Sequence, residues 1–180
     1  MGIRSIVRKD VVVDASAAVA IIRREPHGPW MRRLLHERMR AGDRALVPNT
    51  LWHEVVNVLA RRYRYGADEI LESVARLDAL GLTTVAIGRP GLLLVLEATV
   101  VHGLSSYDAV YLMLAESNDA DLLTLDRVLA IAAGDRAVPP PVDGVREAAQ
   151  PYRLQPWIAW EEAGQYLDAV RQATLEEARR

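Results

Sequence analysis

The chain has 180 residues, 51% of them hydrophobic, a length and composition that suit one well-buried core with an appendage. Its 22 basic and 24 acidic residues give a net charge of -2, so a nucleic-acid partner would have to be met by a local basic patch. The absence of cysteine excludes disulfides, thiolate catalysis and sulfur-ligated zinc. We see neither a secretory signal nor an apolar stretch long enough for a membrane span, and therefore expect a soluble, cytoplasmic protein.

Strand and helix patterns alternate through the first three quarters of the chain. In chain order, the first half is predicted to contain a strand at 11–13, helices over 15–22 and 30–40, a strand at 45–47, and helices over 50–65 and 69–80. Gly66 is expected to close the helix that begins at residue 50. The second half is predicted to contain a strand at 82–87, helices over 91–101 and 108–117, a strand at 122–125, and a helix over 127–132. This alternation favours an α/β domain built on a parallel sheet.

The character of the chain changes after Gly134. Three consecutive prolines at 139–141 indicate a stiff linker, and from Trp157 apolar residues recur at helical spacing. We therefore expect an α/β domain at 1–138, a proline-containing linker at 139–156 and a C-terminal amphipathic helix at 157–180. Three roles are open to this helix: it packs on the domain, it joins two subunits, or it covers an acidic cleft.

Two aspartates follow predicted strands. Asp14 comes directly after the first strand and Asp126 directly after the fourth. In an open parallel sheet the strands end at a common edge, where ligands bind, so both carboxylates are expected there. Taken alone, each aspartate is equally well explained as a helix cap.

Two further acids lie on the apolar faces of predicted helices. Glu54 shares a helical stripe with Leu51 and Val58, and Asp108 shares one with Tyr111. Carboxylates are rarely buried unless something pairs with them. A buried salt bridge to an arginine is one alternative for either acid, and the dipole at the start of its helix is another for Asp108.

The four acids together predict a cation site. Two unit charges about 4 Å apart repel by about 4 kcal/mol at an effective dielectric near 20, so crowded carboxylates need a counter-charge or a raised pKa. Oxygen ligands suit Mg²⁺ or Mn²⁺, which can activate water and neutralise a phosphate during an in-line displacement. The constellation of Asp14, Glu54, Asp108 and Asp126 therefore points to hydrolysis of a phosphodiester.

Four segments around these acids resemble the PIN-domain family, and within it the VapC-like toxins of toxin-antitoxin pairs. The segments are VVVDASAAVA, VPNTLWHEVVNVL, LSSYDAVYLMLAE and LLTLDRVL. The resemblance implies a PIN-like α/β/α sandwich with a central parallel sheet of four to five strands, and a Mg²⁺- or Mn²⁺-dependent endoribonuclease. It implies that Asp14, Asp108 and Asp126 bind the metal directly and that Glu54 acts through water. Ser16 and Thr124 match hydroxyl residues that orient the acids, although capping and strand propensity explain them equally well.

The same resemblance implies partners for the chain. These are an RNA substrate, a separately encoded VapB-like antitoxin that blocks the site, and a second copy in a homodimer. Family members usually end with a short fifth strand, for which residues 142–145 are the candidate here. Two alternatives stay open: a nuclease of RNA processing that is not a toxin, and a metal-free binding module on the same scaffold.

Two arginine clusters are candidate RNA contacts. They contain Arg23 and Arg24, and Arg61 and Arg62 with Tyr63 beside them. Arginine can bind phosphate through two hydrogen bonds and tyrosine can stack on a base. Such clusters are also typical of solvated helix faces.

Overall fold

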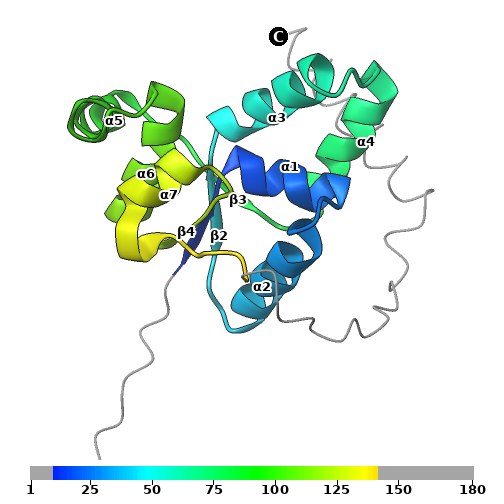
Figure 1. Cartoon of the computed structure of the whole chain (residues 1–180), viewed down its shortest axis with the longest axis horizontal. Coiled ribbons are helices and arrows are strands. Elements are labelled where there is room, and N and C mark those ends of the chain that lie inside the picture. Colours follow the sequence, from blue (N-terminus) through cyan, green and yellow to red (C-terminus); the bar gives the residue numbers. More distant parts are fainter. Residues whose placement is uncertain (1–9, 142–180) are drawn as a thin grey trace, which may run out of the picture. The chain divides into compact units, whose positions relative to one another are not determined.

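A computed structural model describes residues 10–141 of the protein (Figure 1). The candidate fifth strand at 142–145, the C-terminal helix at 157–180 and most of the linker lie outside the described residues. Across the described part of the chain, no helix has the length and apolarity that crossing a bilayer requires.

The core of the fold is a parallel sheet of four short strands. They are β1 (Val11–Val13), β2 (Ala45–Pro48), β3 (Thr83–Val85) and β4 (Asp121–Leu123). Their spatial order is β3-β2-β1-β4, and every neighbouring pair is parallel. The chain therefore steps outward from β1 to β3 and returns on the other side of β1 with β4. The carboxyl ends of β1 and β4 flank the switch point at which such sheets bind ligands.

The two edges of the sheet differ. At one edge, Thr83 and Thr84 of β3 are exposed. At the other, the Val138 amide donates to the Leu122 carbonyl (2.9 Å), and Ala137 forms an isolated parallel bridge with Leu122. Within the described residues, this single bridge stands beside β4 where a fifth strand is expected, so four full strands are confirmed.

Seven helices cover the sheet within residues 10–141. They are α1 (Ala15–Arg23), α2 (Gly28–Arg40), α3 (Thr50–Arg61), α4 (Ala67–Asp78), α5 (Arg89–His102), α6 (Ser106–Ser117) and α7 (Arg127–Ala133). Helix α6 packs against β1, β2 and β4 and is itself contacted by α5 and α7. Figure 1 shows α5, α6 and α7 on one side of the strands and α1 to α4 on the other, which confirms the predicted α/β sandwich. Strand β1 is wholly buried between these layers, as its β-branched sequence predicts.

The predicted role of Gly66 is wrong. Helix α3 ends at Arg61, and Gly66 instead begins α4, with its amide donating to the Glu69 carboxylate (2.8 Å). The residue that takes the left-handed conformation in the intervening turn is Arg64, with φ of 61°. The physical reason is tertiary, because the tyrosines that follow α3 leave the helix to pack against the end of α1.

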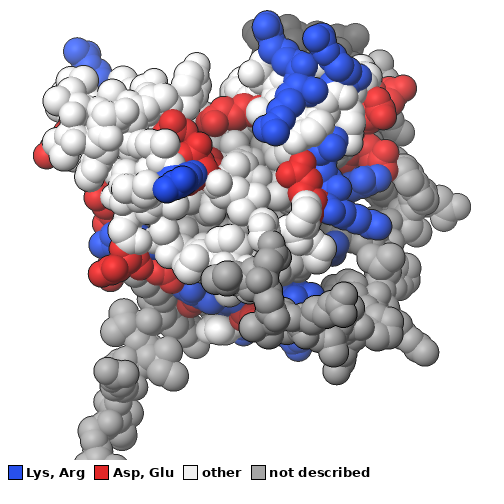
Figure 2. Space-filling model, viewed as in Figure 1, with Lys and Arg blue, Asp and Glu red and all other residues white. Residues whose placement is uncertain are grey.

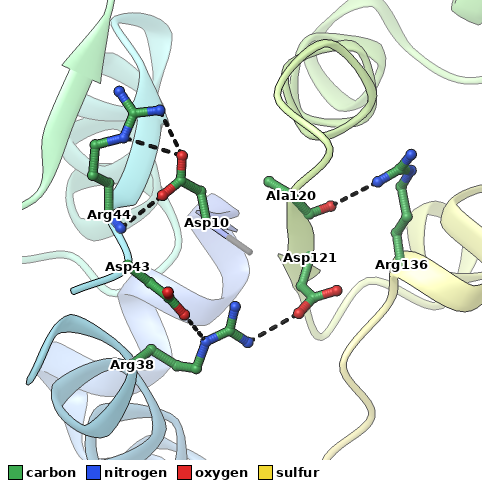
Figure 3. A network of polar contacts seen from close by, with 7 residues as sticks. All are labelled: Asp10, Arg38, Asp43, Arg44, Ala120, Asp121 and Arg136. Carbon is green, nitrogen blue, oxygen red and sulfur yellow. Dashed lines mark hydrogen bonds and ion pairs between the residues drawn. The ribbon is translucent and has the colours of Figure 1, made fainter. Parts of the chain in front are cut away.

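Ion pairs join the strands at their amino ends, as Figure 3 shows. Asp10 accepts hydrogen bonds from the Arg44 amide (2.8 Å) and the Arg44 guanidinium (3.0 Å), which ties the start of β1 to that of β2. Arg38 of α2 pairs with Asp43 and, at 2.9 Å, with Asp121 at the start of β4. The acids at this edge of the sheet are thus neutralised by arginines.

Candidate active site

Asp14 lies at the centre of the carboxyl edge. It follows β1 directly, is only 4% exposed, and caps α1. Its amide donates to the Leu123 carbonyl (3.0 Å), so the end of β1 is fastened to the end of β4. This places the Asp14 carboxylate at the switch point of the sheet.

Two hydroxyl groups orient the Asp14 carboxylate. Its Oδ2 accepts hydrogen bonds from the Ser16 hydroxyl, from the Ser16 amide (3.2 Å) and from Thr124 Oγ1 (2.8 Å). The same hydroxyls accept hydrogen bonds from the amides of Leu125 and Asp126, each at 2.9 Å. Burial raises the pKa of Asp14, and the Ser16 and Thr124 hydrogen bonds act against that rise. Asp14 and the loop that carries Asp126 are therefore positioned by one shared pair of side chains.

Glu54 approaches this point from α3. It is half-buried, and its Oε1 accepts a hydrogen bond from the Tyr111 hydroxyl (3.0 Å) of α6. Burial raises the pKa of Glu54 to about 7; the negative charges of Asp14 and Asp108 add to the rise, and the Tyr111 hydrogen bond opposes it. Glu54 therefore lies within electrostatic range of two of the other acids, as expected for crowded carboxylates.

The other two acids take part in the capping of their helices. Asp108 lies in the first turn of α6. Its Oδ2 accepts a hydrogen bond from the Ser105 hydroxyl (2.7 Å), and its backbone amide donates one to Ser105 Oγ (3.1 Å). Asp126 is exposed and caps α7 by accepting from the Leu129 amide (2.9 Å). The capping interpretation of the sequence therefore describes a real contact of Asp126, and Asp108 lies in the first helical turn, where the dipole interpretation expects it.

The salt-bridge interpretation does not hold within the described residues. No arginine in that part of the chain forms an ion pair with Asp14, Glu54, Asp108 or Asp126. Figure 2 shows acidic atoms facing the space between the α5–α7 side and the α1–α4 side of the molecule. The carboxyl edge thus differs from the amino edge in carrying acids without paired cations.

The donor set fits a hard divalent cation by its chemistry. All candidate ligands are carboxylate oxygens, the kind that Mg²⁺ and Mn²⁺ prefer. Among residues 10–141, however, no three histidine, aspartate or glutamate side chains lie close enough to hold one ion as they stand. Binding would therefore require the acids to converge, with Asp108 and Asp126 giving up the contacts that cap their helices.

The candidate RNA-binding arginines are of two kinds. Arg23 is engaged within the protein: its guanidinium carbon lies 3.3 Å from the centre of the Tyr63 ring, and it donates to Tyr65 (2.7 Å) and Glu25 (3.1 Å). Tyr63 also donates to Glu25 (2.8 Å). This cluster fastens the end of α1 to the turn after α3, and one face of Tyr63 is already covered by Arg23.

The remaining candidates are exposed. Arg24, Arg61 and Arg62 are exposed, and the Arg62 guanidinium carbon lies 5.4 Å from the Tyr63 ring centre. Basic atoms gather over the α3 region in Figure 2, beside the acidic surface. RNA contact by these three residues stays a prediction.

One partner within the site was missed at the sequence level. Tyr111 appears in the sequence only as an apolar neighbour of Asp108, yet its hydroxyl holds Glu54. A buried tyrosine generally needs a hydrogen-bond partner, which is the one available signal, but it does not name the partner.

Comparison with known proteins shows a family and similar solved structures. The family described as PIN domain matches residues 11–135 of the chain. The chain is also similar to the crystal structure of PAE2754 from Pyrobaculum aerophilum, with a TM-score of 0.54 and 23% sequence identity over 73% of this chain and 90% of that chain. At that identity the likeness shows a shared fold. No curated protein matches the sequence.

The raised pKa of Glu54 predicts a pH dependence of stability. The folded state disfavours ionised Glu54. The contribution of protonated Glu54 to the free energy of unfolding is therefore fully present below a pH of about 4.5 and is lost as pH rises through about 7. Without divalent cations, Glu54→Gln should therefore gain about 1–2 kcal/mol of stability over the wild type between pH 5 and pH 8, after allowing for solvent screening.

Urea unfolding at the two pH values measures this difference. Glu116→Gln, at an exposed position of α6, is the matched control and should differ from the wild type equally at both. A Glu54→Gln gain that is the same at pH 5 and pH 8 would contradict the electrostatic description of the site.

Proposed function

The chain belongs to the PIN domain family, and we propose that it is a Mg²⁺- or Mn²⁺-dependent endoribonuclease acting through Asp14, Glu54, Asp108 and Asp126. PIN domains are generally nucleases that use divalent metals, and membership suggests an RNA substrate. The observation that carries the proposal is a group of carboxylates near the switch point that form no ion pair with any residue of 10–141, with the charges of Asp14 and Asp108 acting on Glu54. A cellular RNA substrate agrees with the cytoplasmic location expected from the sequence.

The chain's own residues have distinct parts in this proposal. Asp14 is held by two hydroxyl groups, so its carboxylate is oriented before any ligand arrives. Glu54, with a pKa of about 7, is partly protonated at neutral pH and would release that proton when positive charge enters the site. A divalent cation, when bound, would supply an activated water and neutralise the phosphate. The exposed Arg24, Arg61 and Arg62 would hold the RNA backbone beside the acids.

We further propose that the nuclease is the toxin of a toxin-antitoxin pair. The support is the likeness of the four acidic segments to VapC-like toxins. A VapB-like antitoxin, encoded separately, would then block the site. A PIN nuclease of RNA processing remains the alternative, because it would share the same acids.

We also propose a homodimer formed through α5. This helix is apolar on nearly all sides, and its exposed side chains include Leu93 (71%), Val100 (74%) and Val101 (67%). The neighbouring Val128 (60%) and Ile131 (71%) of α7 extend this exposed apolar surface, and a large contiguous apolar surface marks a site of protein contact. The part of Figure 2 where α5 lies, at the upper left, is largely free of charge. A second copy of this face is complementary to it, because both are apolar.

Cleavage of labelled RNA with Mn²⁺ or Mg²⁺ tests the nuclease. Asp14→Asn and Asp108→Asn should each lower the rate by more than about 100-fold, beyond the effect of residues that only support metal ligands. Asparagine keeps the capping ability of aspartate, so both variants should stay folded. Asp68→Asn, at an exposed position of α4, is the control and should keep full activity. Undiminished cleavage by both site variants would place the activity elsewhere, and a folded wild type with no cleavage would favour the binding module.

Induced expression in a bacterial host tests the toxin role. The wild-type chain should arrest growth, Asp14→Asn should not, and co-expression of the protein encoded next to this chain should restore growth. A chain that cleaves RNA in vitro but leaves growth unaffected would favour the processing nuclease.

Light scattering of the full chain after size exclusion tests the dimer. The wild type should give about 40 kDa, twice the chain mass of 20.0 kDa, and the double variant Leu93→Glu, Val100→Glu should give the monomer mass. Leu71→Glu, at an exposed leucine of α4, is the control and should remain dimeric. A monomeric wild type, or a double variant that still dimerises, would contradict this interface.

A further inference from the structure

Tyr111 is buried in apolar surroundings, yet its hydroxyl group makes a polar contact. It is fully buried in α6, which packs against three strands of the sheet. Its hydroxyl donates to Glu54 Oε1 at 3.0 Å, across 57 positions of sequence. Tyr111 also follows Asp108 by one helical turn, so α6 contributes an acid and the partner of another acid to the same site.

The contact restricts an otherwise adaptable side chain. Glu54 has several rotatable bonds and is only half-buried, so ordering it costs conformational entropy. The Tyr111 ring, in contrast, is locked by the core around it. The Tyr111 hydroxyl is the donor of this hydrogen bond, and an ionised carboxylate oxygen can only accept it. Glu54 Oε1 is therefore held by the protein.

We propose that Tyr111 is a positioning residue, which holds Glu54 by one carboxylate oxygen and leaves only the other available to a divalent cation or its bound water. The inference rests on the proposed function. It adds that the carboxylate of Glu54 is oriented by a phenol, as that of Asp14 is oriented by Ser16 and Thr124. A tyrosine that merely filled the core would stabilise the fold without affecting the affinity for the cation.

Binding of Mn²⁺ to the full chain without RNA, followed by electron paramagnetic resonance, separates these possibilities. Tyr111→Phe keeps the ring and removes only the donor, and it should weaken Mn²⁺ binding about 10- to 100-fold, the range seen for residues that orient metal ligands. Tyr107→Phe, at an exposed tyrosine of the same helix, should bind as the wild type does. Circular dichroism and melting of the metal-free proteins establish that the variants are folded.

A mutant cycle shows whether Tyr111 acts through Glu54. In the Glu54→Gln background, adding Tyr111→Phe should change Mn²⁺ affinity by less than about twofold, because the two effects are not independent. Glu54→Asp leaves the core intact, keeps the charge and draws the carboxylate away from Tyr111, and it should also bind Mn²⁺ more weakly.

The outcomes distinguish this inference from the function on which it rests. The positioning role alone is overturned if Tyr111→Phe or Glu54→Asp binds Mn²⁺ with wild-type affinity. It is also overturned if Tyr111→Phe weakens Mn²⁺ binding as much in the Glu54→Gln background as in the wild type. Absence of Mn²⁺ binding by the wild type overturns the proposed function and this role together.

Discussion

The mutual repulsion of carboxylates at the carboxyl edge of the sheet is the constraint on which the site depends. Asp14 is almost completely buried there, and no arginine of the described residues pairs with it. Its charge is balanced only in part, by the Ser16 and Thr124 hydroxyls and the amide of Ser16. Burial, and then the negative charges of Asp14 and Asp108, raise the pKa of Glu54 to about 7. Because buried charge is costly without a partner, this edge is arranged for a ligand that brings positive charge.

At the opposite edge of the sheet, where the strands begin, the acids are neutralised by arginines and the ion pairs stabilise the fold. There, Asp10, Asp43 and Asp121 all pair with arginines, and these pairs hold the starts of three strands and the end of α2 together (Figure 3). Ligands of an open parallel sheet bind beyond the carboxyl ends of its strands, and among the described residues that is the edge whose acids form no ion pair with arginine. The difference lies in the side chains, and it separates the stabilising end of the domain from its reactive end.

Local sequence signals predicted most of the fold and the approximate place of each acid. The run Val11–Val13 has the pattern of a fully buried parallel strand, and the two aspartates that follow strands were placed at one edge by the rule that parallel strands end together. The signals failed where the deciding contact is distant in sequence. The end of α3 is set by the packing of Tyr63 on Arg23, and the orientation of Glu54 by Tyr111 in another helix. Neither pairing leaves a periodic trace in the chain.

Helix ends explain how the acids can lie near one another before any cation binds. Asp14 and Asp126 cap α1 and α7, and Asp108 lies in the first turn of α6, so all three aspartates lie where a helix dipole favours negative charge. Glu54 lies in the middle of α3 and lacks this support; burial, together with the charges of Asp14 and Asp108, raises its pKa to about 7. The capping contact of Asp126 and metal ligation are therefore alternative uses of one ionised carboxylate. The metal-free fold is then stabilised by contacts that a cation would exchange for stronger ones, so capping and metal binding are successive uses of the same side chains.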